Sequence, residues 1–130
     1  MEYCDFERWR RQEGLRFDTK TADKLGTSAQ TLRNWRGKGR TPLWVDHATR
    51  AISCGCEPLV LTVTTVKDWQ IRNGLDTYEA TAKVFGYKRQ AVHQWFSRGS
   101  FPRWLAMAAP GYEIKDHLSD PGNVSAKRAS

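Results

Sequence analysis

The feature of this sequence that most constrains its fold is an internal repeat with a period of 60 residues. Aligned with itself at this offset and without a gap, the chain pairs all six of its tryptophans and has twelve identities between positions 9–48 and 69–108. Chance would give only a small fraction of these at this composition. The chain is therefore predicted to be a tandem duplication of a unit of about 50 residues. The identical pairs are Trp9 and Trp69, Gly14 and Gly74, Leu15 and Leu75, Thr21 and Thr81, Ala22 and Ala82, Gly26 and Gly86, Gln30 and Gln90, Trp35 and Trp95, Gly39 and Gly99, Pro42 and Pro102, Trp44 and Trp104, and Ala48 and Ala108.

The composition is that of a small, basic, globular protein. The chain has 130 residues, a net charge of +7 and 39% hydrophobic residues, which is too apolar for a wholly disordered protein. No apolar run approaches the roughly 20 residues of a membrane-spanning helix, and the first residues contain no apolar segment typical of a signal peptide. We therefore expect a cytoplasmic protein with no membrane partner.

The three cysteines do not predict a disulfide scaffold or a zinc site. Their number is odd, and the spacing of Cys54-Gly55-Cys56 is not that of a zinc ribbon. We expect reduced thiols, no metal and no cofactor. A metal site assembled from Cys4, Cys54, Cys56 and His47 is a minor alternative.

The positive charge is concentrated in two blocks that contain no acidic residue. Residues 24–45 and 80–112 carry five lysines and arginines each, interleaved with aromatic residues. An anionic polymer favours such a surface, so a nucleic acid is a better candidate partner than a membrane. The six tryptophans are predicted to be core anchors rather than base-stacking groups, since Trp35 and Trp95 follow Leu32 and Val92 on a helical stripe.

Each unit is predicted to contain four helices, so the fold class is all-α, with two tandem four-helix domains. Gly26 and Gly86 are expected to end the second helix of each unit. That helix is expected to be capped by Asp18 or Thr19 in the first unit, and by Asp76 or Thr77 in the second, where Glu79 would complete a capping box with Asp76. The expected helices cover residues 6–12, 19–25, 29–36 and 44–52, then 66–73, 77–85, 88–97 and 103–109.

The domain boundaries follow from these helices. We expect a first domain at 1–53, a linker at 54–65, a second domain at 66–112 and a disordered tail at 113–130. Within the linker, residues 59–64 are rich in β-branched side chains and are predicted to form either a short strand or a plain extended segment. The thirteen residues 53–65, which join the two units, span at most about 43 Å, enough to set two helices one DNA turn, about 34 Å, apart.

The second and third helices of each unit are separated by a short glycine-containing turn, which is typical of a helix-turn-helix. Their pattern of small and apolar residues resembles the helix-turn-helix of phage Cro and cI-type repressors. The resemblance covers about 45 residues of each half and implies a DNA-binding protein of phage or prophage origin that represses transcription. Phage Cro proteins are usually single units that dimerise, whereas this chain carries two units. The residues that carry the resemblance are Ala22, Leu25, Gly26, Leu32 and Trp35, with Ala82, Phe85, Gly86, Val92 and Trp95.

A recognition helix presents its N-terminal part to the major groove. By this resemblance the base-reading positions fall at the start of the third helix of each unit. Arg can form a bidentate contact with guanine, and Gln or Asn with adenine, which favours Arg33, Arg89, Gln30 and Gln90. The full candidate set is Ser28, Ala29, Gln30, Arg33 and Asn34 in the first unit, and Lys88, Arg89, Gln90, His93 and Gln94 in the second.

Phosphate contacts are expected from helix N-termini and from the basic residues around them. The candidates are Thr19, Lys20, Lys38, Arg40, Lys83, Arg98 and Arg103.

The sequence thus predicts a sequence-specific regulator that binds double-stranded DNA as a single-chain pseudo-dimer. Because the two recognition helices differ, we expect two unlike half-sites. One alternative is that one unit reads DNA while the other pairs chains in a homodimer. A second is that the units bind a host protein such as RNA polymerase. No catalytic residue is predicted, because the three histidines are scattered and no carboxylate pair lies in a basic block.

Overall fold

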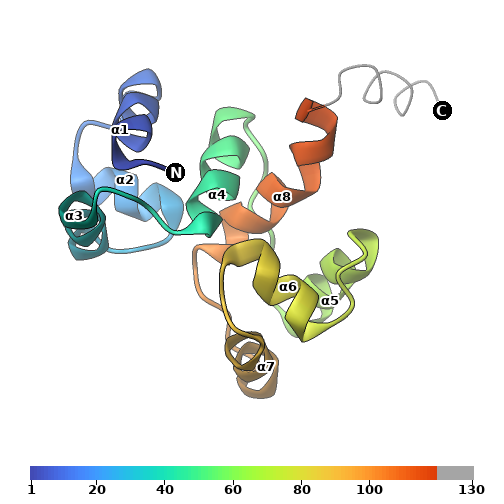
Figure 1. Cartoon of the computed structure of the whole chain (residues 1–130). Coiled ribbons are helices and arrows are strands. Elements are labelled where there is room, and N and C mark those ends of the chain that lie inside the picture. The colour runs from blue at the N-terminus through green and yellow to red at the C-terminus, as the bar shows by residue number, and fades with distance from the viewer. Residues whose placement is uncertain (120–130) are drawn as a thin grey trace.

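A computed structural model describes residues 1–119. The described chain is all-α, as predicted, and contains eight helices and no strand (Figure 1). We call residues 1–53 the first half and residues 63–119 the second half. The helices are α1 (Tyr3–Gln12), α2 (Asp18–Leu25), α3 (Ala29–Lys38) and α4 (Leu43–Ser53), followed by α5 (Val63–Arg72), α6 (Tyr78–Phe85), α7 (Arg89–Arg98) and α8 (Leu105–Ser119).

The two halves repeat the same buried polar contacts at the 60-residue spacing. The hydroxyl of Thr21 donates to the carbonyl of Leu15 and accepts from the Nε of Arg10 at 3.1 Å. In the second half, Thr81 donates to Leu75, and Gln70 donates to Thr81 at 2.8 Å. In both halves the contact ties the first helix to the second, and it satisfies a hydroxyl that would be costly to bury alone.

The expected cap of α2 is wrong, whereas for α6 one of the two expected caps, Thr77, is confirmed without the expected capping box. Asp18 and Thr19 lie inside α2, whose N-cap is Phe17. Asp18 accepts instead from Arg10 at 3.0 Å. Arg10 is only 4% exposed, so its buried charge would be costly to leave without a partner. In α6 the cap is Thr77, whose hydroxyl accepts from the backbone N–H of Ala80, so Asp76 does not form the expected capping box.

The expectation that the last helix ends near residue 109 is also wrong. Helix α8 continues through Pro110 to Ser119, so residues 113–119 are helical rather than a disordered tail. Pro110 has no N–H to donate to the carbonyl of Ala106. The backbone N–H of Leu59, in the linker, donates to that carbonyl instead at 2.8 Å. Residues 120–130, the rest of the expected tail, lie outside the described residues.

The linker forms no strand in the described structure. Its residues 57–62 are loop, and α5 begins at Val63, three residues earlier than expected. A strand needs a partner, and this segment finds its hydrogen-bond acceptor on a helix. Thr62 caps α5 through a capping box with Thr65, which explains the earlier start.

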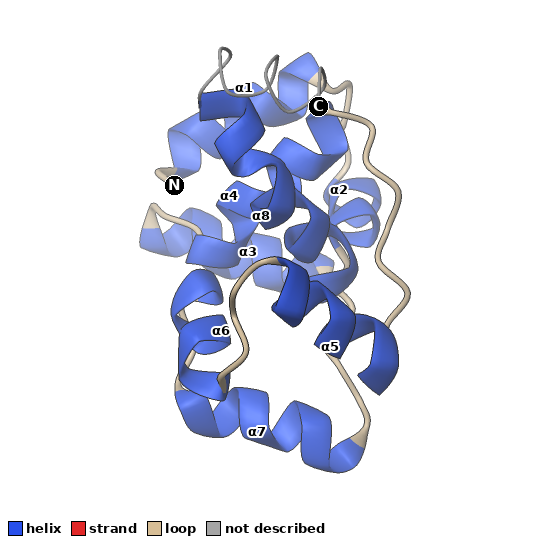
Figure 2. Cartoon of the chain, turned by 90° about the vertical axis from the view of Figure 1, so that its right-hand side faces the viewer, coloured by secondary structure: helices blue, strands red, loops and turns tan. Residues whose placement is uncertain are grey.

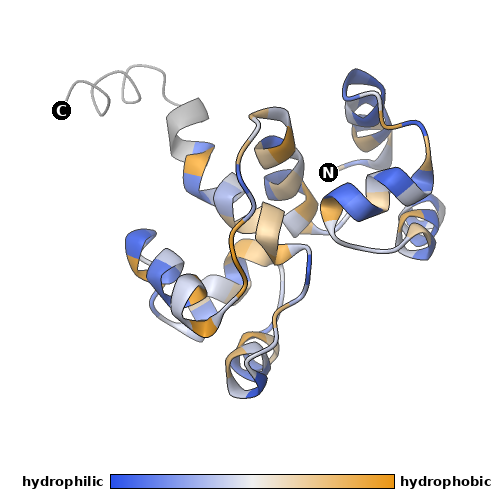
Figure 3. Cartoon of the chain, turned by 180° about the vertical axis from the view of Figure 1, so that it is seen from behind, coloured by the Kyte–Doolittle hydropathy of each residue, from blue (hydrophilic) through white to orange (hydrophobic). Residues whose placement is uncertain are grey.

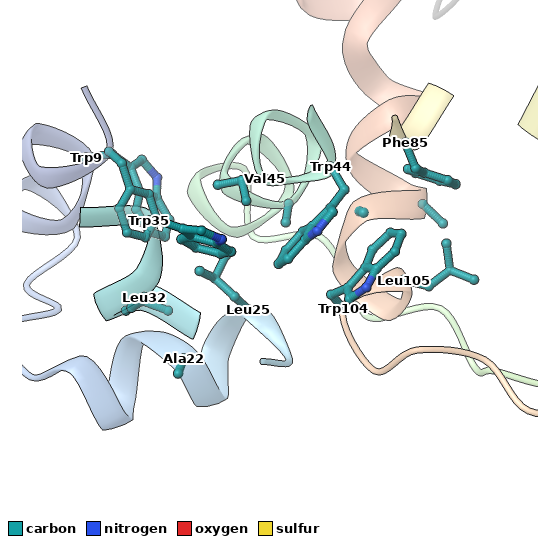
Figure 4. Packing of buried hydrophobic residues seen from close by; sticks show 14 of the residues in the cluster. Trp9, Ala22, Leu25, Leu32, Trp35, Trp44, Val45, Phe85, Trp104 and Leu105 are labelled. Carbon is teal, nitrogen blue, oxygen red and sulfur yellow. The ribbon is translucent and has the colours of Figure 1, made fainter. Parts of the chain in front are cut away.

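A single hydrophobic core extends through both halves (Figure 4). Five of the six tryptophans are at most 9% exposed, as expected for core anchors, and Trp95 is half-buried. Trp44 and Trp104, which are equivalent in the repeat, stack with ring centroids 4.8 Å apart. The aromatic contacts that join the two halves run from Phe6 to Trp35, Trp44, Trp104, Phe85 and Trp69.

Helices α4 and α8 lie at the centre of the molecule and pack against each other (Figure 1). In Figure 3 they carry more apolar residues than α1 and α2, which lie at the right of that view. The spacing between the halves is therefore set by helix packing, and the reach of the linker does not determine it.

His47 of α4 is buried between the halves. Its Nε2 donates to the carbonyl of Val84 at 3.0 Å, and its Nδ1 lies 3.3 Å from the guanidinium of Arg50. Its ring also packs edge-on against Phe85 and Tyr112. This arrangement suits a neutral imidazole, because a proton on Nδ1 would face the N–H of Arg50. Burial, with the charge of Arg50, lowers the pKa of His47 below its ordinary value.

We expect the stability of the protein to fall on mild acidification. Since the pKa of His47 is lowered in the folded state, the unfolded chain binds the proton more readily. Stability is then full above about pH 6.5, the ordinary histidine pKa, and is lost as the pH falls from there toward the folded pKa. Urea denaturation between pH 8 and pH 5 measures this loss.

The matched control is His47→Gln, whose amide can still donate toward Val84 but does not titrate. The variant should show a shallower decrease in stability between pH 7 and pH 5. An identical pH dependence in the two proteins would contradict the assignment to His47.

Candidate nucleic-acid interface

The first candidate reading helix, α3, begins just after a tight turn. Gly26 ends α2 with φ +86°, a backbone conformation that is cheap only for glycine. The hydroxyl of Ser28 then caps α3 by accepting from the backbone N–H of Thr31. Ser28 is therefore used as a cap, and the side chains left exposed early in α3 are those of Gln30, Arg33 and Asn34.

These three side chains hydrogen-bond one another along the helix. Arg33 donates to the amide oxygen of Gln30 at 3.1 Å, and Gln30 donates to Asn34, also at 3.1 Å. The contacts leave guanidinium N–H groups of Arg33 available to an outside acceptor. The predicted base-reading residues of the first half therefore form one polar row on an exposed face, next to the half-buried Ala29.

The second candidate reading helix, α7, has the same local geometry. Gly86 ends α6 with φ +78°, and Lys88 is the N-cap of α7 without a side-chain capping bond. The predicted base-reading residues are all exposed: Lys88, Arg89, Gln90, His93 and Gln94. This face carries two cations where the corresponding positions of α3 have Ser28 and Ala29.

Tyr78, on the first turn of α6, contacts two of these side chains. The guanidinium of Arg89 lies over its ring at 5.8 Å, and the ring of His93 meets it edge-on at 5.3 Å. On its other side Tyr78 stacks with Phe96. Tyr78 therefore restricts how Arg89 and His93 project from α7.

The sequence analysis did not single out Tyr78, although a comparison of the two halves could have pointed to it. The positions equivalent to Tyr78 and Phe96 are Asp18 and Arg36, which form an ion pair at 3.3 Å. A charge pair in one half thus corresponds to an aromatic pair in the other. Both pairs connect the second helix of the half to its reading helix.

The predicted base-reading role of α7 implies that Tyr78→Ala changes base preference as well as DNA affinity. Without the ring, Arg89 and His93 gain rotamer freedom that binding must remove, at about 0.5–1.5 kcal/mol for each ordered side chain. The variant should bind the preferred duplex several-fold more weakly and discriminate less at the bases that α7 contacts. Competition binding with singly substituted duplexes measures both effects.

Tyr78→Phe is the control, since it keeps the ring and removes only the hydroxyl. It should retain the base preference of the unmodified chain. A uniform loss of affinity in Tyr78→Phe, with unchanged preference, would instead assign Tyr78 to a phosphate contact.

The predicted phosphate contacts are exposed, but two of them have acidic neighbours. Arg103 forms an ion pair with Asp23 of the other half at 3.2 Å, and the Nζ of Lys83 lies 4.0 Å from Glu79. Both pairs are solvent-exposed, so each is weak. The remaining candidates lie on exposed surface without a described ion pair: Thr19, Lys20, Lys38, Arg40 and Arg98.

Helices α3 and α7 occupy the same side of the molecule. Figure 1 views both nearly end-on, at the left and at the bottom, away from the C-terminal end of α8. In Figure 2 α7 runs lengthwise across the lower edge. The two candidate reading helices thus lie at the two ends of one face of the molecule, the lower-left face in Figure 1. Helices α4 and α8 lie behind this face, toward the centre of the molecule.

Comparisons with protein-family models, curated proteins and solved structures found no match. Function therefore has to be argued from the geometry of this chain. Among residues 1–119, no helix is long and apolar enough to cross a membrane. Within the same range, Cys4, Cys54, Cys56 and His47 do not gather into a group that could hold a metal ion.

Proposed function

We propose that this protein is a sequence-specific regulator of transcription that binds double-stranded DNA as a single-chain pseudo-dimer, as a Cro-like repressor. The observation that carries the proposal is the pair of reading helices. Both α3 and α7 follow a glycine turn, expose polar side chains that can bind base edges, and flank one face of the molecule.

The charge distribution also supports DNA as the partner. Both reading helices lie in the acid-free blocks of the sequence, so no carboxylate on α3 or α7 would repel phosphate. The alternative is a host protein such as RNA polymerase, but a protein partner does not require phosphate-neutralising charge on both helices. The resemblance to phage repressors is the basis for repression rather than activation.

The experiment that tests the proposal is selection of bound duplexes from a randomised library at about physiological ionic strength. At this salt, purely electrostatic binding is suppressed, so enrichment reports sequence-specific contacts. An enriched sequence supports the proposal. The absence of enrichment would overturn it and favour a protein partner.

We expect Arg89→Ala and Lys38→Ala to weaken DNA binding in different ways. Loss of a bidentate guanine contact should cost about 1–3 kcal/mol and relax the preference at one base position. Loss of a phosphate contact should weaken all sequences alike and reduce the slope of log affinity against log salt by about one. Fluorescence anisotropy with the selected duplex and with single-base variants, at several salt concentrations, separates the two effects.

The two variants serve as controls for each other, because both residues are exposed and neither change should unfold the protein. Identical base preferences in Arg89→Ala and Lys38→Ala would contradict this division between base-reading and phosphate contacts.

A further inference from the structure

The contacts between the two halves are reciprocal. Gly26 of the first half lies against Arg103 of the second, where a Cβ on the glycine would be 2.7 Å from the backbone carbonyl carbon. Gly86, the counterpart of Gly26, lies against Leu43, the counterpart of Arg103, where a Cβ would be 3.2 Å from that of Leu43. Each half therefore offers the turn before its reading helix to the same position of the other half.

One further contact, and one pair of residues on a shared hollow, follow the same symmetry. Trp44 stacks on its own counterpart Trp104 at 4.8 Å, as residues next to an axis that exchanges the halves do. His47 bonds to Val84, and the counterparts of this pair, Met107 and Lys24, line one hollow between the halves. Self-pairing and reciprocal contacts are the signature of an isologous, two-fold interface. In a translational repeat, one half would offer one surface and the other half a different one.

The interface that relates the halves also uses the apolar face of the last helix of each half. Val45 and Ala48 of α4 and Leu105 and Ala108 of α8 are at most 1% exposed within the single chain. A second copy therefore finds this face already covered. The apolar surface through which two separate chains would pair is buried within one chain.

From this symmetry we infer that one chain recognises two unlike half-sites in inverted orientation on one DNA duplex. The inference rests on the proposed function and adds the orientation of the half-sites and the stoichiometry. A two-fold relation between α3 and α7 directs them to oppositely oriented sequences, because the two strands of B-DNA are themselves related by two-fold axes. A direct repeat would require the two helices to be related by translation.

The two half-sites, which we call the arms of the DNA site, differ in sequence because the two reading helices present different side chains. Arm one is read by Gln30, Arg33 and Asn34, and arm two by a helix that begins with Lys88 and Arg89. The site is therefore an inverted pair without being a palindrome. Arg33→Ala should relax the base preference at one position of one arm only, and Arg89→Ala at one position of the other arm only. These two variants assign the arms to the helices.

The test uses the full chain and the duplex enriched by selection. Three duplexes of equal length are compared. The first is the enriched sequence, the second is the same sequence with the direction of one arm reversed, and the third is a palindrome made from two copies of arm two. Affinity is measured by anisotropy at about physiological salt, and the number of chains per duplex by sedimentation of a labelled duplex.

The inference expects one chain per enriched duplex, and binding about 100-fold weaker or more when one arm is reversed, because several base contacts are lost together. Orientation is read from Gln30→Ala and Gln90→Ala, because these two residues are equivalent in the repeat. In the inverted orientation the two variants lose preference at two bases that lie on opposite strands and equally far from the centre of the site. Loss at two bases of the same strand would overturn the inverted orientation while leaving sequence-specific binding intact. If two chains bound the palindrome with higher affinity than one chain binds the enriched duplex, the stoichiometry of one chain per site would be overturned. Failure of the selection itself would overturn the proposed function, so the two failures are distinguishable.

Discussion

Trp104→Ala is expected to lower the free energy of unfolding by about 3–5 kcal/mol, the usual cost of truncating a buried tryptophan. Trp104 is 7% exposed and stacks on Trp44 of the other half. It also contacts Phe85 at 5.3 Å and Tyr87 at 5.4 Å, measured between ring centroids. The cavity left by its removal would lie where the two halves meet. Urea denaturation followed by circular dichroism and by tryptophan fluorescence measures the change.

The shared core predicts that both halves unfold in one cooperative transition, so the two probes should give the same midpoint in the unmodified chain. Phe17→Ala is the matched control, because Phe17 is aromatic but 63% exposed and its truncation should change stability by less than about 0.5 kcal/mol. Two separate transitions in the unmodified chain, or a loss in Trp104→Ala no larger than in Phe17→Ala, would contradict a core that joins the halves.

Gly111→Ala is expected to destabilise the protein by about 1–3 kcal/mol or more through overpacking. Gly111 lies in α8, where a Cβ would be only 1.8 Å from the carbonyl oxygen of His47 in α4. Adding one methyl group would thus force the two central helices apart. The carbonyl of Gly111, which accepts from Arg50 at 3.0 Å, would move with them.

Gly37→Ala provides a control with the same chemical change inside a helix. No atom lies within 4 Å of a Cβ built on Gly37 in α3, so the helix propensity of alanine should dominate and stabilise the protein by up to about 1 kcal/mol. The two substitutions should therefore shift the thermal midpoint in opposite directions. Similar shifts for both would show that α4 and α8 do not approach as closely at Gly111 as described.

Local features of the fold followed from sequence patterns. The eight helices occur where apolar spacing predicts them, and Gly26 and Gly86 end α2 and α6 with positive φ. These features depend on interactions within a few residues of the chain, such as turn conformations that favour glycine. The sequence pattern also predicted that the candidate base-reading residues are exposed, because polar residues between apolar helical positions face solvent.

Two of the errors share a physical cause. Asp18 was expected to cap a helix but pairs with Arg10, which lies earlier in the sequence on another helix. The last helix was expected to cover residues 103–109, and thus to end just before Pro110, whose missing N–H leaves one helical acceptor without its usual donor. In the fold, Leu59 supplies the missing donor and α4 fills the space beside Gly111. Both of these errors arose where a residue on another element changed the local preference.

The sequence by itself determined the helical class, the repeat, the exposure of the basic residues on α3 and α7 and the burial of most tryptophans, since all of these depend on local spacing and residue type. Only the tertiary structure decided how the halves are related. The repeat is equally compatible with two units on a flexible linker, with a translational array and with a two-fold pair. The choice depends on which surfaces meet, and the stacking of Trp44 on Trp104 and the close crossing at Gly111 are contacts between residues some 60 positions apart.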